Sequence, residues 1–265
     1  MSAAVDGSLA SVDGEIMPVL EATIPATDEG LVRGDGVFEV IRIYDGRPFA
    51  LEEHLTRLQR SAQNLRLGLD LEAVRSDAHR LLAQAGVGPA HGQLRIMLTR
   101  GGRRLLMTEP LHESPPRTRV SAVTYAPTRI LDGIKSLSYA ANMLATRLAQ
   151  ERGFDEALLV TPHGRVLEAP TSSFFWIKDG AVLTPPLDDH ILASITRRIV
   201  IEVSGAQERP CTLQDARDAD EAFLASTTRE VQTICALDDH EFPAHTPVTD
   251  GLVDAVAAHI RAELG

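Results

Sequence analysis

The chain has 265 residues, of which 44% are hydrophobic and 24% are charged, and this composition is typical of a soluble globular protein. A formal net charge of −11 argues against a nucleic-acid partner, because such partners require a basic surface. No apolar run approaches the roughly 20 residues of a membrane span, and the first residues do not resemble a signal peptide. With two cysteines, too few for a disulfide framework, these features predict a cytoplasmic protein with no membrane partner.

The first part of the chain predicts a small domain over residues 1–111. Runs of β-branched and aromatic residues favour strands, and apolar residues at helical spacing favour helices. In chain order we expect a hairpin of residues 37–44 and 47–51 around Asp45-Gly46, helices over 52–67 and 71–84, and a strand over 93–99. The aperiodic stretch around Pro115-Pro116 predicts an interdomain linker over residues 112–119.

The second part, residues 120–265, predicts a larger domain. Its expected elements are a strand over 120–125, a helix over 139–151, hairpins of 156–160 with 165–167 and of 173–177 with 181–183, a helix over 194–203, a strand over 221–225 and a helix over 249–264. Strands and helices do not alternate strictly, and hairpins join many of the strands. This pattern favours a mixed-sheet α/β or α+β fold over a doubly wound parallel sheet.

Several well-known motifs are excluded. Gly34-Asp-Gly36 lacks the third glycine of a dinucleotide fingerprint and leads into a strand. The sequence contains neither a Gly-Lys-Ser/Thr phosphate loop nor a Gly-x-Ser-x-Gly elbow. The nine histidines are scattered, and Glu52-Glu-His54 lacks the second histidine of a zinc helix, so we expect no metal site.

Lysine is scarce, and this scarcity limits the possible chemistry. Of the 26 basic residues only Lys135 and Lys178 carry a primary amine; the others are arginines, which cannot act as amine nucleophiles. Lys178 occupies a hairpin tip, where a lysine is ordinarily solvated. Lys135 stands between a predicted strand and a predicted helix with apolar neighbours, where a partly desolvated amine can form a Schiff base.

Other segments supply groups that can bind an anion. Arg57 on the first helix can hold a phosphate with its planar fork, and the helix start at Ser194-Ile195-Thr196 offers main-chain N–H groups. Ser226-Thr227-Thr228 adds hydroxyl groups, and Glu168 adds a carboxylate before a Pro170 turn. An amine, a phosphate cup and an acid for a pyridine nitrogen are together what a pyridoxal phosphate site requires.

The sequence resembles the fold-type IV, pyridoxal-phosphate-dependent aminotransferases. This group includes the D-amino-acid and branched-chain transaminases and aminodeoxychorismate lyase, and the resemblance covers about residues 28 to 265. The motifs that carry it are Arg33-Gly-Asp-Gly-Val-Phe-Glu39, Glu53-His-Leu-Thr-Arg-Leu58, Ile134-Lys-Ser-Leu-Ser-Tyr139, Val166-Leu-Glu-Ala-Pro-Thr-Ser-Ser-Phe-Phe175, Lys178-Asp-Gly180, Ser194-Ile-Thr-Arg197 and Ala225-Ser-Thr-Thr-Arg-Glu230.

The resemblance implies a role for each of these positions. Lys135 forms the Schiff base with the cofactor and moves the proton at the substrate's α-carbon, and Glu168 pairs with the pyridine nitrogen. Tyr139 reaches the ring hydroxyl. The phosphate is held by Arg57, Ile195, Thr196, Ser226 and Thr227. The resemblance also implies a small α/β domain, a larger pseudo-barrel domain, a site between the two and a homodimer.

The substrate is less well defined by these motifs. Gln93-Leu-Arg95 stands where branched-chain enzymes have Tyr-x-Arg, and Ser226-Thr-Thr-Arg229 replaces their Gly-Thr-Ala-Ala. Leu98-Thr-Arg-Gly101 resembles the D-amino-acid transaminases, in which the arginine matching Arg100 grips the substrate carboxylate. The histidine that follows two residues later in that group is Gly102 here, so Arg95, Arg103 and Arg33 are alternatives, with Thr228 as a further substrate contact.

Three functions remain open at this point. The first is a transaminase that exchanges an amino group between an amino acid, with D-amino acids favoured over branched-chain L-amino acids, and a 2-oxo acid such as 2-oxoglutarate or pyruvate. The second is aminodeoxychorismate lyase, which releases pyruvate. The third is a binding protein that kept the fold without catalysis, and the complete set of cofactor residues argues against it.

Overall fold

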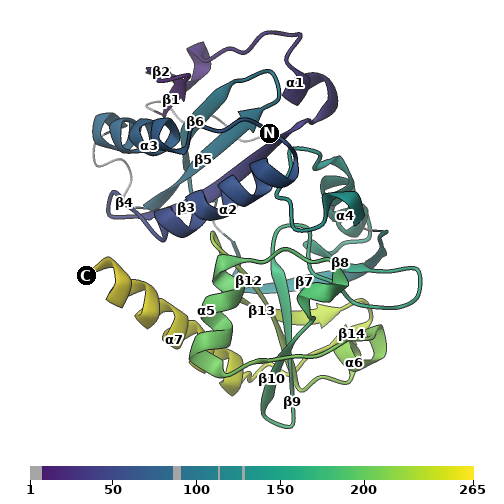
Figure 1. Ribbon diagram of the computed structural model, residues 1–265. Helices are drawn as coiled ribbons and strands as arrows, with labels where there is room; N and C mark the ends of the chain where they lie inside the picture. Colours follow the sequence, from purple (N-terminus) through teal and green to yellow (C-terminus); the bar gives the residue numbers. More distant parts are fainter. Residues whose placement is uncertain (1–7, 86–90, 113, 127–128) are drawn as a thin grey trace. The chain divides into compact units, whose positions relative to one another are not determined.

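The chain forms two compact units in a computed structural model that describes residues 8–85, 91–112, 114–126 and 129–265 (Figure 1). The first unit comprises Met1–His112 together with Ile134–Tyr139, and the second comprises Glu113–Gly133 with Ala140–Gly265. Among the described residues, none of the helices is long and apolar enough to cross a membrane.

The first unit is built on a six-stranded antiparallel sheet with the order β2-β1-β6-β5-β3-β4. Its strands are β1 (Leu9–Val12), β2 (Glu15–Pro18), β3 (Gly36–Tyr44), β4 (Arg47–Pro48), β5 (His91–Thr99) and β6 (Arg104–Pro110). The hairpin predicted around Asp45-Gly46 is the β3–β4 turn, in which both residues have positive φ. β5, at the centre of the sheet, pairs along the whole length of β3 and with all of β6.

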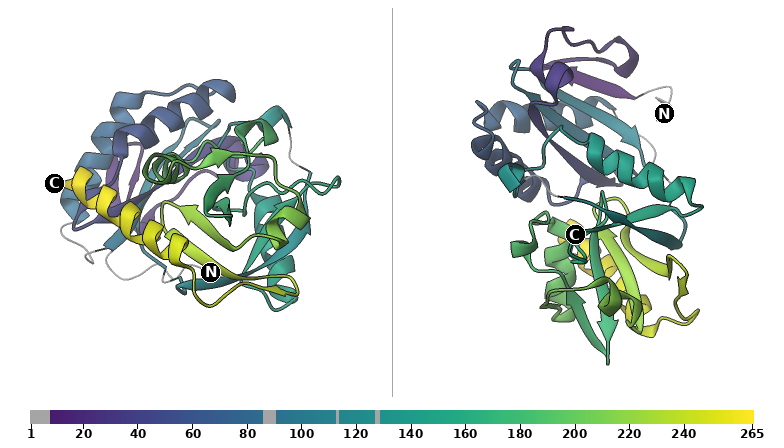
Figure 2. Two further views of the ribbon diagram at one scale, coloured as in Figure 1. Left: turned by 90° about the horizontal axis from the view of Figure 1, so that it is seen from below. Right: turned by 90° about the vertical axis from the view of Figure 1, so that its right-hand side faces the viewer.

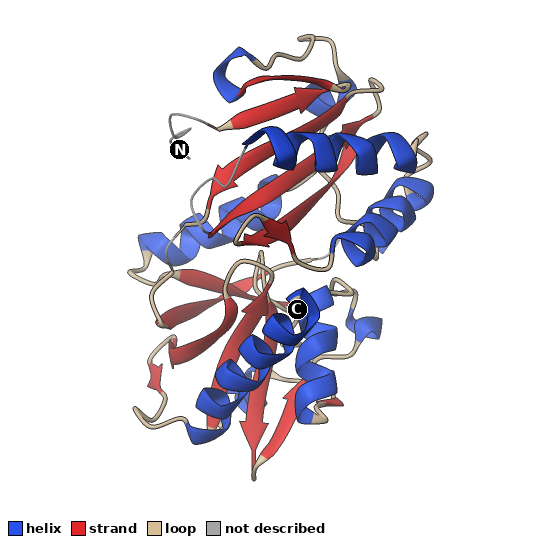
Figure 3. Cartoon of the chain, turned by 90° about the vertical axis from the view of Figure 1, so that its left-hand side faces the viewer, coloured by secondary structure: helices blue, strands red, loops and turns tan. Residues whose placement is uncertain are grey.

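Helices α2 (Leu51–Asn64) and α3 (Leu71–Ala85) pack on this sheet, α2 against β3 and α3 against β6 and β1 (Figure 3). The spacing of Leu51, Leu55, Leu58 and Ala62 gives α2 one apolar face, and all four side chains are buried. The face packs into one core with apolar residues of β3, β5 and β6. The unit also contains the short helices η1 (Val19–Glu21) and α1 (Glu29–Arg33).

Residues Ile134–Tyr139 belong to the first unit, although their place in the sequence lies within the predicted second domain. Val37 and Ser136 form an antiparallel bridge, Phe38 N–H donates to the Lys135 carbonyl at 3.0 Å, and Leu137 N–H donates to the Gly36 carbonyl at 2.8 Å. The segment therefore extends the sheet beside the first residues of β3. Main-chain pairing, which sequence periodicity does not reveal, decides this membership.

The second unit contains an eight-stranded mixed sheet with the order β11-β10-β9-β12-β13-β7-β8, to which β14 adds beside β13. Its strands are β7 (Arg117–Thr124), β8 (Glu156–Val160), β9 (Ser173–Lys178), β10 (Ala181–Thr184), β11 (Gln207–Glu208), β12 (Glu221–Ser226), β13 (Glu230–Leu237) and β14 (His240–Glu241). β7 pairs in parallel with both β13 and β8, whereas β9, β12 and β13 are antiparallel neighbours. The mixed-sheet prediction is confirmed.

Helices cover parts of this sheet. Those of the second unit are η2 (Arg129–Leu131), α4 (Ala140–Glu151), η3 (Leu187–Asp189), α5 (Ile195–Ser204), α6 (Leu213–Arg217) and α7 (Pro247–Leu264). Helices α5 and α7 lie side by side and contact β12, while α4 contacts β7 and β8 (Figures 1 and 2). The core of this unit includes stacked rings of Phe174 with Trp176.

The structure corrects several expected boundaries. Strand β7 begins at Arg117, so the predicted linker of residues 112–119 overlaps the first residues of a strand. Residues 165–167 form isolated bridges, among them Val160 with Val166, and not a full second strand of a hairpin. Strands β1, β2, β6, β11, β13 and β14 were not predicted.

Candidate active site

The main chain of Lys135 is held from two sides. Its carbonyl accepts from Phe38 N–H, and its own N–H donates to the Ser61 hydroxyl of α2 at 3.2 Å. The Lys135 amine lies 4.5 Å from the centre of the Phe38 ring, a cation–π distance, and the Tyr139 ring packs edge-on against the same ring with centroids 5.3 Å apart. Lys135, Phe38 and Tyr139 therefore form one cluster in the first unit.

Two glycines make this placement of Lys135 possible. A Cβ at Gly36 would overlap the Leu98 carbonyl and the Leu137 side chain, so the segment that carries Lys135 approaches β3 only because residue 36 has none. Gly34 ends α1 with φ +68°, a conformation that favours glycine, and a Cβ there would lie 2.9 Å from the Ser138 hydroxyl oxygen. The Gly-Asp-Gly motif thus serves close packing beside the lysine.

Arg57 forms a buried ion pair that the sequence analysis did not predict. Its Nε and Nη2 donate to the two carboxylate oxygens of Glu39, each at 2.6 Å. His54, one turn earlier on α2, places Nδ1 2.8 Å from Glu39 Oε2 and 3.4 Å from Arg57 Nη2. Glu39 and His54 are fully buried, and the Arg57 side chain is almost so.

The protonation states within this triad follow from its contacts. Burial alone would raise the pKa of Glu39, but the Arg57 charge and the bonds from Arg57 and His54 outweigh it and lower the pKa to about 2. Burial lowers the pKa of His54, and the nearby positive charges of Arg57 and Lys135 lower it further. At neutral pH the triad therefore holds an ionised Glu39, a charged Arg57 and a neutral His54.

In the second unit, Glu168 is fixed at both its main chain and its carboxylate. Its carbonyl accepts from Leu159 N–H at 2.9 Å, and its Oε1 accepts from Leu192 N–H at 3.1 Å. Burial raises the pKa of Tyr125, and the negative charge of Glu168 raises it further. The Tyr125 hydroxyl therefore stays protonated and donates to Asn142 Oδ1 at 3.2 Å. These contacts hold the half-buried Glu168 carboxylate in a fixed position.

The start of α5 has the geometry of an anion site. Ser194 caps the helix by accepting from Arg197 N–H at 3.2 Å, as predicted from the sequence. Within the described residues, the main-chain N–H groups of Ile195 and Thr196 have no hydrogen-bond acceptor, and both residues are buried. Two such donors at the positive end of a helix dipole favour a bound anion.

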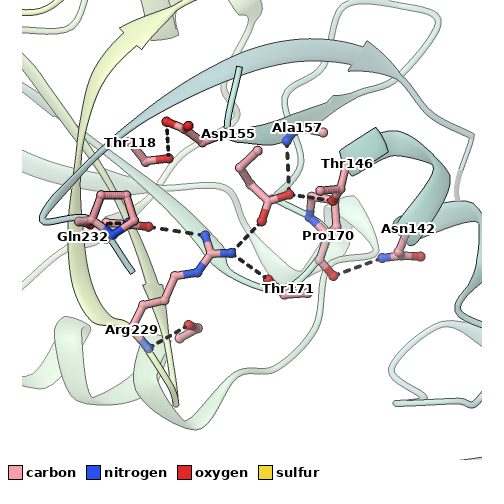
Figure 4. A network of polar contacts seen from close by, with 12 residues as sticks. Thr118, Asn142, Thr146, Asp155, Ala157, Pro170, Thr171, Arg229 and Gln232 are labelled. Carbon is pink, nitrogen blue, oxygen red and sulfur yellow. Dashed lines mark hydrogen bonds and ion pairs between the residues drawn. The ribbon is translucent and has the colours of Figure 1, made fainter. Parts of the chain in front are cut away.

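The Ser226-Thr227-Thr228 turn joins β12 to β13 and is held by Arg229. Ser226 Oγ accepts from Arg229 N–H at 3.4 Å. The Arg229 guanidinium donates to Glu156 Oε2 at 2.7 Å and to Thr171 Oγ1 at 3.5 Å (Figure 4). Because Thr171 follows Glu168 by three residues, this network connects the hydroxyl-bearing turn with the loop that carries the carboxylate. Arg229 and Glu156 were missed by sequence reasoning.

The four candidate arginines for the substrate carboxylate are not brought together. Each instead pairs with a carboxylate of the first unit: Arg33 with Glu29, Arg95 with Glu109, Arg100 with Asp35 and Arg103 with Asp13. The guanidinium of Arg100 also donates to the Leu65 and Arg66 carbonyls, so the geometry gives Arg100 a structural anchor at the end of α2. The substrate role expected of Arg100 stays a prediction.

Arg95 is placed differently from the other three. In the β3–β5 register Val40 lies opposite Arg95, and Phe38 lies opposite Met97. Side chains two residues apart on a strand share a face, so Arg95 and Phe38 point to the same side of the sheet as diagonal neighbours. Such neighbours lie about 7–8 Å apart, within reach of long side chains.

No cluster of three or more histidine, cysteine or carboxylate side chains with metal-binding geometry occurs among the residues described. Both cysteines are free thiols, and burial raises the pKa of Cys211, so it stays protonated at neutral pH. The candidate groups are therefore an amine in the first unit and a carboxylate, hydroxyls and main-chain N–H groups in the second.

Comparison with known proteins gives the class. The model of the family described as amino-transferase class IV matches residues 36–237, and the chain belongs to this family. The chain is 33% identical over 254 residues to a "Putative branched-chain-amino-acid aminotransferase" of Methanocaldococcus jannaschii, with 86% of this chain and 87% of that protein covered. It is also 33% identical over 244 residues to a D-alanine aminotransferase of Listeria innocua, with 82% and 83% covered.

Solved structures agree with this class. A fold IV transaminase of Curtobacterium pusillum is 29% identical and superposes with a TM-score of 0.89 over 97% of this chain and 99% of its own. A hypothetical aminotransferase of Mycobacterium tuberculosis, 27% identical with a TM-score of 0.88 over 97% and 99% of the two chains, was solved in a PLP-bound form. The protein is an aminotransferase of class IV with the fold-type IV architecture, its cofactor is pyridoxal 5′-phosphate, and its substrates are amino acids and 2-oxo acids.

Proposed function

We propose that the protein is a transaminase that prefers D-amino acids as donors and uses 2-oxoglutarate or pyruvate as the acceptor. The observation that carries the assignment is the fixed main chain of Lys135, which holds the amine over the Phe38 ring. The preference for D-amino acids is supported by the Ser226-Thr-Thr motif and by the relatives named D-alanine aminotransferase.

The residues on the site fit pyridoxal phosphate, which supplies an aldehyde and an electron-withdrawing ring when bound. We assign Lys135 to the covalent bond with the aldehyde and to taking the proton from the substrate's α-carbon. Glu168, whose carboxylate is held by Leu192 N–H, would keep the pyridine nitrogen protonated, and Tyr139 would hydrogen bond to the ring hydroxyl.

The phosphate would be held by groups that suit an anion. They are the guanidinium of Arg57, the main-chain N–H groups of Ile195 and Thr196, and the hydroxyls of Ser226 and Thr227. The two N–H groups without a protein acceptor at the start of α5 support this assignment most directly. Such groups, once buried, cost free energy unless a ligand or water accepts from them.

For the substrate carboxylate we propose Arg95, with Thr228 as a further contact. The register that puts Arg95 on the same side of the sheet as Phe38 supports this choice over Arg33, Arg100 and Arg103. Arg95 binds Glu109 through Nε and Nη2, which leaves Nη1 out of that ion pair. An arginine with one edge held and another edge presented is well suited to bind a carboxylate.

A half-reaction screen tests the function. Purified protein loaded with pyridoxal phosphate is mixed with D-alanine, D-glutamate, L-leucine or L-glutamate singly, and the visible band of the cofactor is followed. We expect the band to fall fastest with D-amino acids and to return on addition of 2-oxoglutarate. No loss of the band with any of the four would contradict the transaminase assignment.

The same screen separates the alternative functions. Faster loss of the band with L-leucine would indicate a branched-chain transaminase, which the 33% identical relative of that name favours. Release of pyruvate from aminodeoxychorismate without a 2-oxo acid would indicate the lyase. The matched control is Lys135→Ala, which should show no half-reaction with any donor, beside Lys178→Ala, which should react like the unchanged protein.

We also propose that the protein is a cytoplasmic homodimer. The family resemblance supports the dimer, and so do the exposed apolar side chains of Leu31 and Val32 on α1. The composition and the two free cysteines support the compartment. Light scattering of the purified protein would measure the mass of the assembly directly.

A further inference from the structure

We propose that Glu39 is a positioning residue for the cofactor phosphate: its carboxylate orients the guanidinium of Arg57 before the cofactor binds. The inference rests on the proposed role of Arg57 in holding the phosphate. It adds a carboxylate from β3, and a histidine from α2, to a site that otherwise consists of groups in direct contact with the cofactor.

The geometry of the ion pair fixes the orientation of the Arg57 guanidinium. Glu39 accepts from Nε and Nη2 of Arg57 at 2.6 Å each, so the contact uses one edge of the planar guanidinium. A guanidinium carries five N–H donors in a fixed plane, and Nη1 lies on the edge that Glu39 does not contact. A two-point contact along one edge sets both the direction of this plane and the side on which Nη1 projects.

The burial of Glu39 supports the same role. Glu39 is fully buried and its pKa lies at about 2, so it carries a full negative charge wherever the enzyme works. An ionised carboxylate is expensive to bury, and partners must compensate for the cost. Arg57 and His54 are the side chains that bind this carboxylate, so its buried charge serves to hold the arginine.

His54 holds the Glu39 carboxylate from a second side. Its Nδ1 lies 2.8 Å from Glu39 Oε2, while its Nε2 is buried with no hydrogen-bond partner among the described residues. The lowered pKa keeps the ring neutral, so the proton sits on Nδ1 and is donated to Glu39. His54 and Arg57, one turn apart on α2, thereby clamp the carboxylate from two directions.

Glu39 has two opposing effects on a bound phosphate. Its charge repels the phosphate, and its bonds hold Arg57 in the binding orientation. The orienting effect is larger than the repulsion. An arginine without a partner loses rotamer freedom when it binds the phosphate, and a buried arginine without Glu39 would turn to other acceptors. Loss of Glu39 should therefore weaken phosphate binding, and tighter binding would contradict the inference.

The test compares pyridoxal 5′-phosphate with pyridoxal, which lacks the phosphate but keeps the aldehyde. Dissociation constants of both are measured on the cofactor-free full chain by the absorbance of the lysine adduct. In Glu39→Gln we expect the constant for pyridoxal phosphate to rise about ten- to a hundredfold, the range expected when a hydrogen bond to a charged group is lost. The constant for pyridoxal should change less than about twofold.

A second variant covers the case in which Glu39→Gln does not fold. His54→Phe keeps an aromatic ring but removes the nitrogen that donates to Glu39, and we expect a smaller change in the same direction. Asp77→Asn is the matched control, because Asp77 is also a buried carboxylate of the first unit that pairs with arginines, with Arg80 at 2.6 Å and with Arg104, although both arginines are partly exposed. It should leave the ratio of the two constants unchanged.

Each outcome has a distinct meaning. If the unchanged protein binds the two aldehydes equally well, Arg57 does not hold the phosphate and the proposed site is wrong. If the unchanged protein prefers pyridoxal phosphate but Glu39→Gln and His54→Phe keep that preference, the positioning role is wrong while the function stands. Equal weakening of both aldehydes would indicate that Glu39 is only structural.

Discussion

The charge on Glu39 makes the first unit sensitive to acid. Its pKa is about 2 in the folded protein against an ordinary value of 4.5, because Arg57 and His54 stabilise the ionised form. A depressed folded-state pKa contributes stability that is present above pH 4.5 and lost as the pH falls toward 2. At about 1.4 kcal/mol per unit, the contribution is on the order of 3 kcal/mol.

Chemical denaturation at pH 7, 4.5 and 3 measures this contribution. At pH 7 we expect Glu39→Gln to lower the free energy of unfolding, because Arg57 loses a buried charge partner. The difference between the variant and the unchanged protein should shrink as the pH falls below 4.5, because Glu39 then takes up a proton in the unfolded chain while it stays ionised in the folded protein down to about pH 2. A difference that stays constant with pH would show that folding does not lower the pKa of Glu39.

Motifs identified single residues well where one residue performs one task. The Ser194 cap followed from the preference of helix N-termini for serine, whereas the role of Lys135, which the scarcity of lysine indicates, stays a prediction. Glu39 and Arg229 could not be predicted, because their partners Arg57 and Glu156 are 18 and 73 residues away along the chain. Arg100 shows the opposite problem, since a motif gives no information about the Asp35 that occupies its guanidinium.

The approach of residues 134–139 to β3 depends on one missing methyl group. A Cβ at Gly36 would overlap the Leu98 carbonyl and the Leu137 side chain, and a main-chain oxygen of a central strand cannot move aside cheaply. We expect Gly36→Ala to cost about 1–3 kcal/mol of stability, as overpacking does. It should also displace the Lys135 segment and slow the formation of the cofactor's lysine adduct.

Gly68→Ala is the matched control for that substitution. Gly68 lies in the same unit, has no positive φ, and no atom lies within 4 Å of the position of its Cβ. It should leave both the melting temperature and the rate of adduct formation close to those of the unchanged protein. Equal behaviour of Gly36→Ala and Gly68→Ala would contradict the close packing described here.

Strong periodicity or a clear cap made an element predictable. Helix α2 has its apolar residues on one face, and α5 begins at a serine cap and ends at Gly205 with φ +67°. The strands that were missed have weak patterns: β1 and β2 have four residues each, and β6 mixes charged and apolar residues without alternation. Such strands form because neighbouring strands offer unpaired main-chain groups, which a local pattern does not show.

At the scale of the molecule, the order of residues along the chain did not determine which unit they join. The Ile134–Tyr139 segment leaves its sequence neighbours and pairs with Gly36, Val37 and Phe38 of the first unit. The mixed-sheet architecture was predictable from the lack of strict strand–helix alternation. The pairing of residues 134–139 with the first unit was not predictable, because it depends on hydrogen bonds between segments about 100 residues apart.

The scarcity of lysine in the whole chain makes the central claim directly testable. The protein with bound pyridoxal phosphate is reduced with borohydride, digested and analysed by mass spectrometry. Lys178 serves as an internal control, because its exposed amine donates to the Asp218 carbonyl at 2.7 Å at a hairpin tip. We predict a phosphopyridoxyl group on Lys135 and none on Lys178; an unlabelled Lys135, or label on Lys178 alone, would contradict the account.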